Sequence, residues 1–241
     1  MIALTYWFQA DHVRAAAANE EVAALSERVG DPFHVGRRWV VFGQIAQSDG
    51  RLSLARDAFE RARAAVEAGG DPLIEALADV GTAFIDIWEG EPDRALVRLE
   101  DRLERALKLG VGLAVPILLT MMAWVELAAG RHRQACDRLE ALLPLIEGRE
   151  MFMTSWALWL LGEAQRPLAD GTAEATALRA QASAEQLGNR LIGAAARQTL
   201  GPRGRCPRRV DGRQAARARR PRRLRRGRPR HLGAGRPGRP R

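Results

Sequence analysis

The sequence predicts an all-α protein, an α-solenoid of helix-turn-helix hairpins that follow one another with a period of about 40 residues. Three observations lead to this prediction. Glycines recur at spacings of 40, 40 and 41 residues, at Gly50, Gly90, Gly130 and Gly171. Small and apolar residues keep the same period at offsets of five, nine and sixteen positions from the first three glycines. The apolar–polar alternation that is typical of strands occurs nowhere in the chain.

A second set of glycines marks the other end of each predicted helix pair. Gly30-Asp31-Pro32 recurs as Gly70-Asp71-Pro72, and Gly110, Gly148 and Gly188 continue the series. Glycine provides the left-handed conformation that ends a helix, aspartate accepts hydrogen bonds from free N–H groups at a helix start, and proline fits the first helical position. Each period is therefore predicted to contain two helices. The residues at the three offsets are Ala55, Ala95 and Ala135, then Phe59, Leu99 and Leu139, then Val66, Ala106 and Ile146.

The helices are expected in pairs along the chain. First helices are predicted at 32–48, 72–89, 111–129 and 150–169, and second helices at 52–68, 92–109, 132–147 and 172–187, before a last helix at 189–200. Ala10 and Ala15 stand one period before Gly50 and Ala55, so residues 1–9 are expected to form the end of a first helix. A single hairpin cannot bury its apolar stripe, which is why neighbouring hairpins are expected to stack into a superhelix.

The period also predicts the domain organisation. A solenoid is expected over 1–200, with a partial repeat at 1–29, repeats at about 30–69, 70–109, 110–148 and 149–188, and a partial repeat at 189–200. Residues 201–241 are expected to form a disordered tail. Because the chain starts and stops inside a repeat, without a polar capping helix, we expect it to be a segment of a longer solenoid.

Composition excludes several classes of protein. Lys108 is the only lysine and follows Leu107, whereas a Walker-type phosphate-binding loop needs glycine before its lysine, so an ATPase of that class is excluded. Cys136 and Cys206 are the only cysteines, too few for a disulfide framework or a cysteine-based zinc site.

The N-terminal and central segments predict a cytoplasmic protein without a membrane partner. Met1 to Ala10 has no basic region before its apolar residues, unlike a secretory signal. The longest apolar run, 111–125, contains Pro116 and is shorter than the roughly 20 residues of a membrane span. Residues 1–200 carry a net charge of −7, which argues against a nucleic-acid-binding surface there.

The repeat pattern resembles known helical repeats. A helix-ending glycine followed five positions later by alanine, as in Gly130-Arg131-His132-Arg133-Gln134-Ala135, resembles tetratricopeptide-like repeats. Together with the Gly-Asp-Pro joints and the Ala/Arg-rich composition, it looks like the helical-repeat region of actinobacterial LuxR-type transcriptional regulators, which are MalT-like and ATP-dependent. That resemblance covers roughly residues 1–200 and implies a protein-interaction or effector-sensing scaffold. The NTPase and DNA-binding modules that flank this region in the family have no matching positions in the chain.

Catalytic and metal sites find little support in the sequence. His132, Cys136 and Glu140 share one predicted helix face, but a fourth ligand at recognisable spacing is missing, so a joint histidine and a buried thiol are favoured over a metal site. Glu100, Asp101 and Glu104 alternate with three arginines, which is the pattern of a solvated face with ion pairs four positions apart. We therefore expect a non-catalytic protein without a metal or other cofactor. The three arginines are Arg98, Arg102 and Arg105.

The tryptophans provide the candidate binding site. All six lie in predicted first helices, which line the concave surface of tetratricopeptide-like solenoids, so they either form a groove for a protein partner or small effector or supply bulk to the core. The six are Trp7, Trp39, Trp88, Trp124, Trp156 and Trp159. The candidate groove consists of Trp124, Met151, Met153, Trp156 and Trp159.

The tail has an extreme composition. Residues 201–241 contain 17 Arg, 6 Pro, 7 Gly and 4 Ala and a single acid, Asp211, and carry a net charge of +16. One interpretation is a basic arm that holds nucleic acid through phosphate contacts, in a stand-alone nucleic-acid-associated protein. The other is a reading frame shifted within a GC-rich gene, because these four residue types share GC-rich codons. The shifted-frame interpretation predicts weak binding of nucleic acid that is indifferent to sequence, whereas tight, sequence-selective binding would favour the basic arm.

Overall fold

The computed structural model describes residues 2–67, 69, 71–148 and 152–201. The chain divides into a compact unit at Met1–Arg203 and a second unit at Gly204–Arg241, which lies outside the described residues. The described part is all-helical and contains no strand. Its helices are α1 (Ile2–Phe8), α2 (His12–Val29), α3 (Pro32–Ser48), α4 (Leu52–Val66), α5 (Pro72–Glu89), α6 (Pro92–Lys108), α7 (Ala114–Ala128), α8 (His132–Ile146), α9 (Phe152–Gln165), the 3-10 turn η1 (Arg166–Leu168), α10 (Ala173–Gln186) and α11 (Arg190–Thr199).

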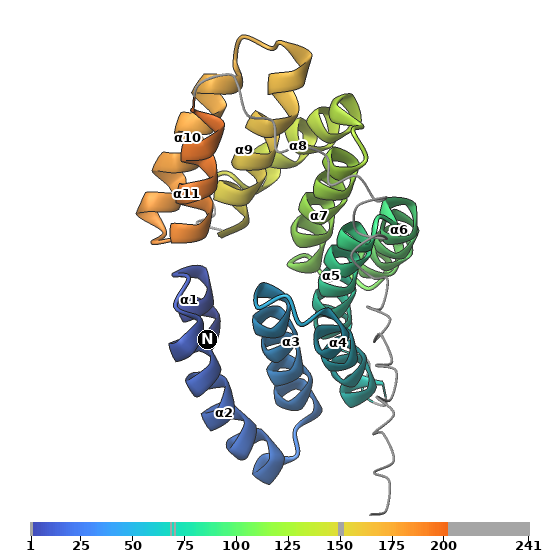
Figure 1. The fold of residues 1–241 in the computed structure, drawn as a ribbon. Coiled ribbons are helices and arrows are strands. Elements are labelled where there is room, and N and C mark those ends of the chain that lie inside the picture. Colours follow the sequence, from blue (N-terminus) through green and yellow to red (C-terminus); the bar gives the residue numbers. More distant parts are fainter. Residues whose placement is uncertain (1, 68, 70, 149–151, 202–241) are drawn as a thin grey trace, which may run out of the picture. The chain divides into compact units, whose positions relative to one another are not determined.

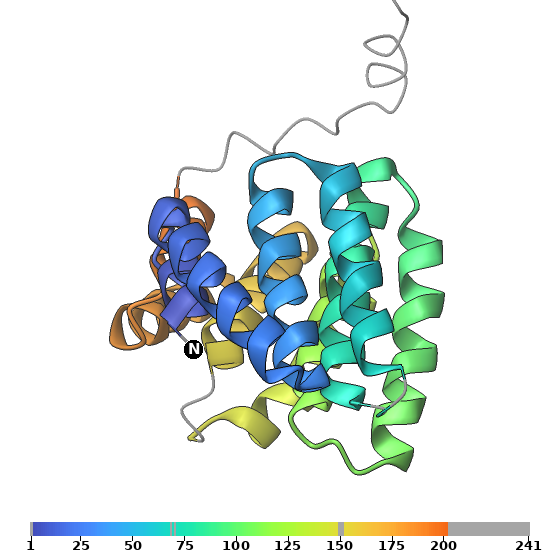
Figure 2. The same ribbon diagram turned by 90° about the horizontal axis from the view of Figure 1, so that it is seen from below.

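Helices pack in the order in which they occur in the chain. Each helix from α1 to α11 contacts the next one, and α3, α5, α7 and α9 also contact one another in succession (Figures 1 and 2). The even-numbered helices α4, α6 and α8 pack between these neighbours. The described part is therefore confirmed as an all-α fold. Each helix contacts more than one neighbour, because its apolar stripe is too wide to be covered by a single helix.

Most helix ends lie where glycine, aspartate and proline predict them. Asp71 accepts hydrogen bonds from the backbone N–H groups of Leu73 and Ile74, at 3.0 Å each, and Asp31 caps α3 in the same way. The predicted joints take left-handed backbone angles, with φ of +74° at Gly50, +85° at Gly90 and +76° at Gly130. The second set does the same at Gly30, Gly110, Gly148 and Gly188, whereas Gly70 lies outside the described residues.

Two helix boundaries differ from the prediction by three residues or more, and one glycine joint differs as well. The helix expected at 111–129 begins only at Ala114, because Gly110 and Gly112 form a turn and no aspartate is present to cap an earlier start. The α-helix expected at 150–169 ends at Gln165, and a 3-10 turn follows that contains Pro167, which has no N–H for an α-helical bond. The expectation of a left-handed joint at Gly171 is wrong. Ala169 takes that conformation instead, with φ of +55°.

The residues that recur every 40 positions form the core. Ala15, Ala55, Ala95 and Ala135 are fully buried, and Ala10 has the left-handed φ of +59° that its alignment with Gly50 predicts. The other two sets are buried as well, which places the periodic residues at helix contacts. A membrane crossing would need a longer apolar helix than any that the described residues form. Those buried sets are Phe59, Leu99 and Leu139, and Val66, Ala106 and Ile146.

Candidate functional site

Four aromatic side chains gather on the neighbouring helices α5, α7 and α9, and we name Phe84, Trp124, Trp156 and Trp159 the aromatic cluster. The Trp124 ring centroid lies 4.5 Å from that of Phe84, 5.5 Å from Trp156 and 5.3 Å from Trp159. Trp124 meets Phe84 and Trp159 nearly edge-on, at 82° and 86°, which is a favourable aromatic geometry. All four side chains remain partly exposed. The structure thus brings together the three tryptophans that the sequence grouped.

The aromatic cluster contains an unused hydrogen-bond donor. The indole Nε1 of Trp156 is buried, and no acceptor lies within reach among the described residues. A buried N–H without an acceptor costs roughly 1–3 kcal/mol, so this position lowers the stability of the fold. Met153, one turn before Trp156, is buried in the adjoining core, while Met151 lies outside the described residues.

The other three tryptophans occupy first helices as predicted but lie apart from the aromatic cluster. Trp7 on α1 donates a hydrogen bond to Ser48 Oγ at 3.0 Å. On α3, Trp39 contacts two guanidinium groups, with the Cζ atoms of Arg38 and Arg61 at 4.3 Å and 4.8 Å from its ring centroid. Trp88 ends α5 with 55% of its surface exposed, which makes it a comparison residue for the aromatic cluster.

Cys136, on the face of α8 that was weighed as a metal site, has the properties of a core residue. Cys136 is 3% exposed, and burial, with a smaller contribution from the charge of Glu140, raises the pKa of its thiol from 9.0 to about 11. The thiol therefore stays protonated and unreactive near neutral pH, as is typical of a buried cysteine. Within the described ranges, no three His, Cys, Asp or Glu side chains come close enough together to hold a metal.

The charged residues of α6 match the prediction only in part, since the acids are exposed and most of the arginines are not. Glu100, Asp101 and Glu104 are exposed, and Glu104 pairs with Lys108 four positions later. Two of the three arginines do not share this solvated face, whereas Arg105 is 52% exposed. Arg98 and Arg102 are only 31% and 12% exposed and turn toward carboxylates on α5. Ion pairs from Arg98 and Arg102 to carboxylates of α5 therefore take the place of the arginine pairs expected within α6.

An ion-pair network around α5 was missed by sequence reasoning. The carboxylates of Asp79 and Asp86 are 5% and 0% exposed, although α5 is otherwise largely apolar. Asp86 accepts a 2.6 Å bond from Arg94, and Asp79 accepts one of the same length from Arg102. Acids spaced along one face of an apolar helix were the signal that could have predicted this network. Its arginines come from both neighbours, Arg56 and Arg63 from α4, and Arg94, Arg98 and Arg102 from α6.

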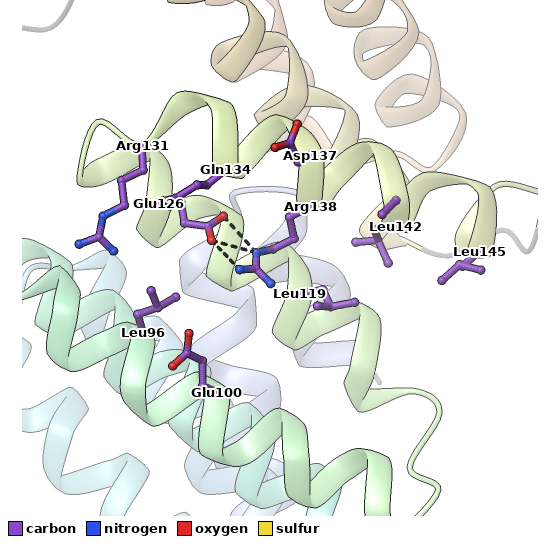
Figure 3. Close-up of a pocket in the computed structure, with 11 residues that line it drawn as sticks. Leu96, Glu100, Leu119, Glu126, Arg131, Gln134, Asp137, Arg138, Leu142 and Leu145 are labelled. Atoms are coloured by element: carbon purple, nitrogen blue, oxygen red, sulfur yellow. Dashed lines mark hydrogen bonds and ion pairs between the residues drawn. The ribbon is translucent and has the colours of Figure 1, made fainter.

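A groove that the sequence did not predict lies between α6 and α8, over α7 (Figure 3). It has a volume of about 600 Å³. At its floor, Arg138 donates from Nε and Nη2 to the carboxylate of Glu126, which is 3% exposed. We name this site the leucine groove, after the side chains that form its apolar part. These are Leu96 of α6, Leu119 of α7, and Leu142 and Leu145 of α8.

The two surfaces offer binding rather than an evident reacting group. The aromatic cluster presents partly exposed rings, and the leucine groove presents apolar side chains beside carboxylates. Such a combination of apolar surface with a few polar groups suits recognition of a peptide or small molecule. In comparisons with known proteins, no family model and no curated protein sequence matches this chain.

Proposed function

We propose that residues 1–200 form a tetratricopeptide-like α-solenoid that serves as a non-catalytic binding module of a LuxR-type transcriptional regulator. Its ligand is a protein partner or a small effector, held at the aromatic cluster. The repeat character is supported by residues 40 positions apart that share one environment, such as the fully buried Ala55, Ala95 and Ala135. The pair Glu126–Arg138 also stands 40 positions after the pair Asp86–Arg98. The regulator family is supported by the glycine joints and their resemblance to such repeats.

The observation that carries the binding role is the partial exposure of four rings on three neighbouring helices. The exposed part of these rings is available to an apolar group on a ligand, and covering it would add hydrophobic stabilisation. Rigid aromatic side chains that remain accessible are typical of binding hot spots.

Selection of ligands from a displayed random peptide library tests this proposal. The full chain is immobilised, and excess heparin occupies the basic residues of 201–241 during selection. Peptides that bind the aromatic cluster should carry apolar or aromatic side chains. Trp159→Ala should weaken their binding at least about tenfold, equivalent to roughly 1.4 kcal/mol, because hot-spot tryptophans contribute this much or more.

Trp88→Ala is the matched control for that measurement. It removes the same type of side chain, from α5, at a position that is 55% exposed and outside the ring contacts that join Trp124, Trp156 and Trp159. Peptide affinity should change less than about twofold in this variant. If Trp159→Ala and Trp88→Ala bind the selected peptides as tightly as the original chain, the aromatic cluster is not the binding site. Far-UV circular dichroism checks that both variants are folded.

The alternative function, nucleic-acid binding, depends on the 17 arginines of residues 201–241. Those residues lie outside the described part of the chain, so their composition alone supports this role. Phosphate neutralisation by arginine gives binding without sequence selectivity and with a steep salt dependence. Removal of the tail separates the two functions, since the aromatic cluster does not include it.

A further inference from the structure

Two grooves of similar size lie 40 residues apart in the chain and carry different chemistry. The first, which we name the charged groove, has a volume of about 560 Å³ and is lined by residues of α4, α5 and α6. The second is the leucine groove between α6 and α8. Leu142 and Leu145 stand 40 positions after Arg102 and Arg105 of the charged groove. The same helix positions therefore carry arginine in one groove and leucine in the other.

The fold does not require leucine at position 145, whereas Leu142 belongs to the core. In the charged groove, Glu75 neutralises both Arg102 and Arg105. In the leucine groove, Leu145 is 60% exposed and Leu142 lies buried beneath it. An exposed leucine in a concave site loses hydrophobic stabilisation that a bound apolar side chain would restore.

The charge that remains free around the leucine groove is negative. The Glu126 carboxylate is taken up by Arg138, and Arg131 pairs with Asp93. Glu100 and Asp137 are exposed, and neither has an ion-pair partner among the described residues. Figure 3 shows Glu100 extending from α6 next to Leu96, whose side chain belongs to the apolar surface. A cation held next to an apolar side chain would match this arrangement.

We propose that the leucine groove binds a basic, leucine-bearing helical segment of a partner protein. Apolar side chains of that segment cover Leu119 and Leu145, and its lysine or arginine side chains reach Glu100 and Asp137. An amphipathic helix laid in a groove is a common mode of peptide recognition, and the acidic edge selects a basic partner. This site is separate from the aromatic cluster and does not depend on the function proposed for it.

A fluorescein-labelled synthetic helix with leucines on one face and arginines beside them is the probe. It is titrated into the full chain, and binding is followed by fluorescence anisotropy. The original chain should bind this peptide at least about tenfold more tightly than a peptide with glutamates in place of the arginines. Leu145→Ala and Glu100→Lys should each weaken the binding of the basic peptide about tenfold, since one removes apolar contact and the other reverses the charge.

Matched controls distinguish the leucine groove from general attraction. Leu107 on α6 has the same 60% exposure as Leu145 but does not line the groove, and Asp101 is an exposed acid next to Glu100. Leu107→Ala and Asp101→Lys should change the affinity less than about twofold.

Three outcomes would overturn the proposal. The first is equal affinity for the basic and acidic peptides, and the second is equal loss in the groove variants and their controls. The third is loss in Trp159→Ala with Leu145→Ala unchanged, which would assign the peptide to the aromatic cluster. Because the peptide-library selection reports on Trp159 and this titration on Leu145, failure of one proposal is distinguishable from failure of the other.

Discussion

The ring of Phe59 occupies the space that a side chain at position 81 would need, so that a Cβ atom on Gly81 would overlap it. Gly43 stands in the same relation to Phe59, because a Cβ atom there would lie only 2.5 Å from the ring atom Cε1. Phe59 extends from α4 and is fully buried between α3 and α5, which carry the two glycines. The two glycines therefore allow α3 and α5 to close around one large side chain.

Gly81→Ala should destabilise the protein by at least about 1–3 kcal/mol, because the added methyl group must displace a packed ring. The free energy of unfolding is measured by urea denaturation with far-UV circular dichroism. Adding Phe59→Leu should recover part of the loss, since leucine stands at the corresponding positions 99 and 139. Gly162→Ala is the control, because its nearest non-local contacts would lie at an ordinary 3.5 Å and alanine favours helix. An equal loss of stability in Gly81→Ala and Gly162→Ala would show that the contact between Gly81 and the Phe59 ring is not the cause.

Ala95→Leu should cost roughly 1–3 kcal/mol through overpacking at a fully buried position. Ala175→Leu makes the same exchange on the exposed side of α10 and should leave stability within about 0.5 kcal/mol. Thermal or urea unfolding of both variants measures the difference. Similar stabilities for the two would show that the periodic alanines are not close helix contacts.

Local chemistry explains why the helix boundaries could be predicted. The ends at Gly30, Gly90 and Gly130 depend on one residue with a left-handed conformation, and the starts after Asp31 and Asp71 depend on a side chain that caps its own helix. Local chemistry also explains why the left-handed joint predicted at Gly171 was wrong. The 3-10 turn at 166–168 shifts the left-handed position to Ala169, and proline rather than glycine determines that end.

Contacts between helices could be predicted only where a single feature repeats. The tryptophans of α7 and α9 were grouped correctly because they share first-helix positions, as their ring distances show. The Phe59–Gly81 contact, the buried Asp86 and the leucine groove depend on which faces of three helices meet. Spacing within one helix does not contain that information, so Arg98 and Arg102 were wrongly assigned to a solvated face.

Arg138→Met should destabilise the protein by about 3–5 kcal/mol, because it leaves the buried carboxylate of Glu126 without its partner. The double variant Glu126→Leu/Arg138→Met removes the charge as well as its partner and should recover most of this loss. A double-mutant cycle on urea unfolding measures the coupling. Additive losses in the cycle would show that the two side chains act independently.

The Cys136 thiol should make stability decline in alkaline solution. Its pKa is about 11 in the folded protein because the thiol is buried, against 9.0 ordinarily. Below the lower value both states hold the proton, and as pH rises from 9.0 to about 11 the unfolded state loses it first, so unfolding becomes more favourable.

The measurement compares the Cys206→Ser variant with Cys206→Ser/Cys136→Ala, so that one thiol or none remains. The urea midpoint of the first should fall more than that of the second between roughly pH 8 and pH 10.5. Near neutral pH, labelling of Cys136 by a thiol reagent should be slow and should follow unfolding, since the reactive form is the thiolate. Parallel pH profiles of the two variants, or rapid labelling of the folded protein, would contradict a buried thiol.

Removal of residues 201–241 separates the two candidate functions of the whole chain. The full chain should bind DNA and RNA weakly, because its 17 tail arginines neutralise phosphates, while residues 1–200 carry a net charge of −7 and should not bind. Affinity is measured by fluorescence anisotropy for several sequences at about 0.15 M salt and again at higher salt. The tail contains no aromatic residue for base stacking, so single-stranded and double-stranded ligands of several sequences should bind similarly and lose affinity steeply with salt. Tight, sequence-selective binding that disappears on truncation would instead assign the tail a selected nucleic-acid function and favour the alternative over the binding module.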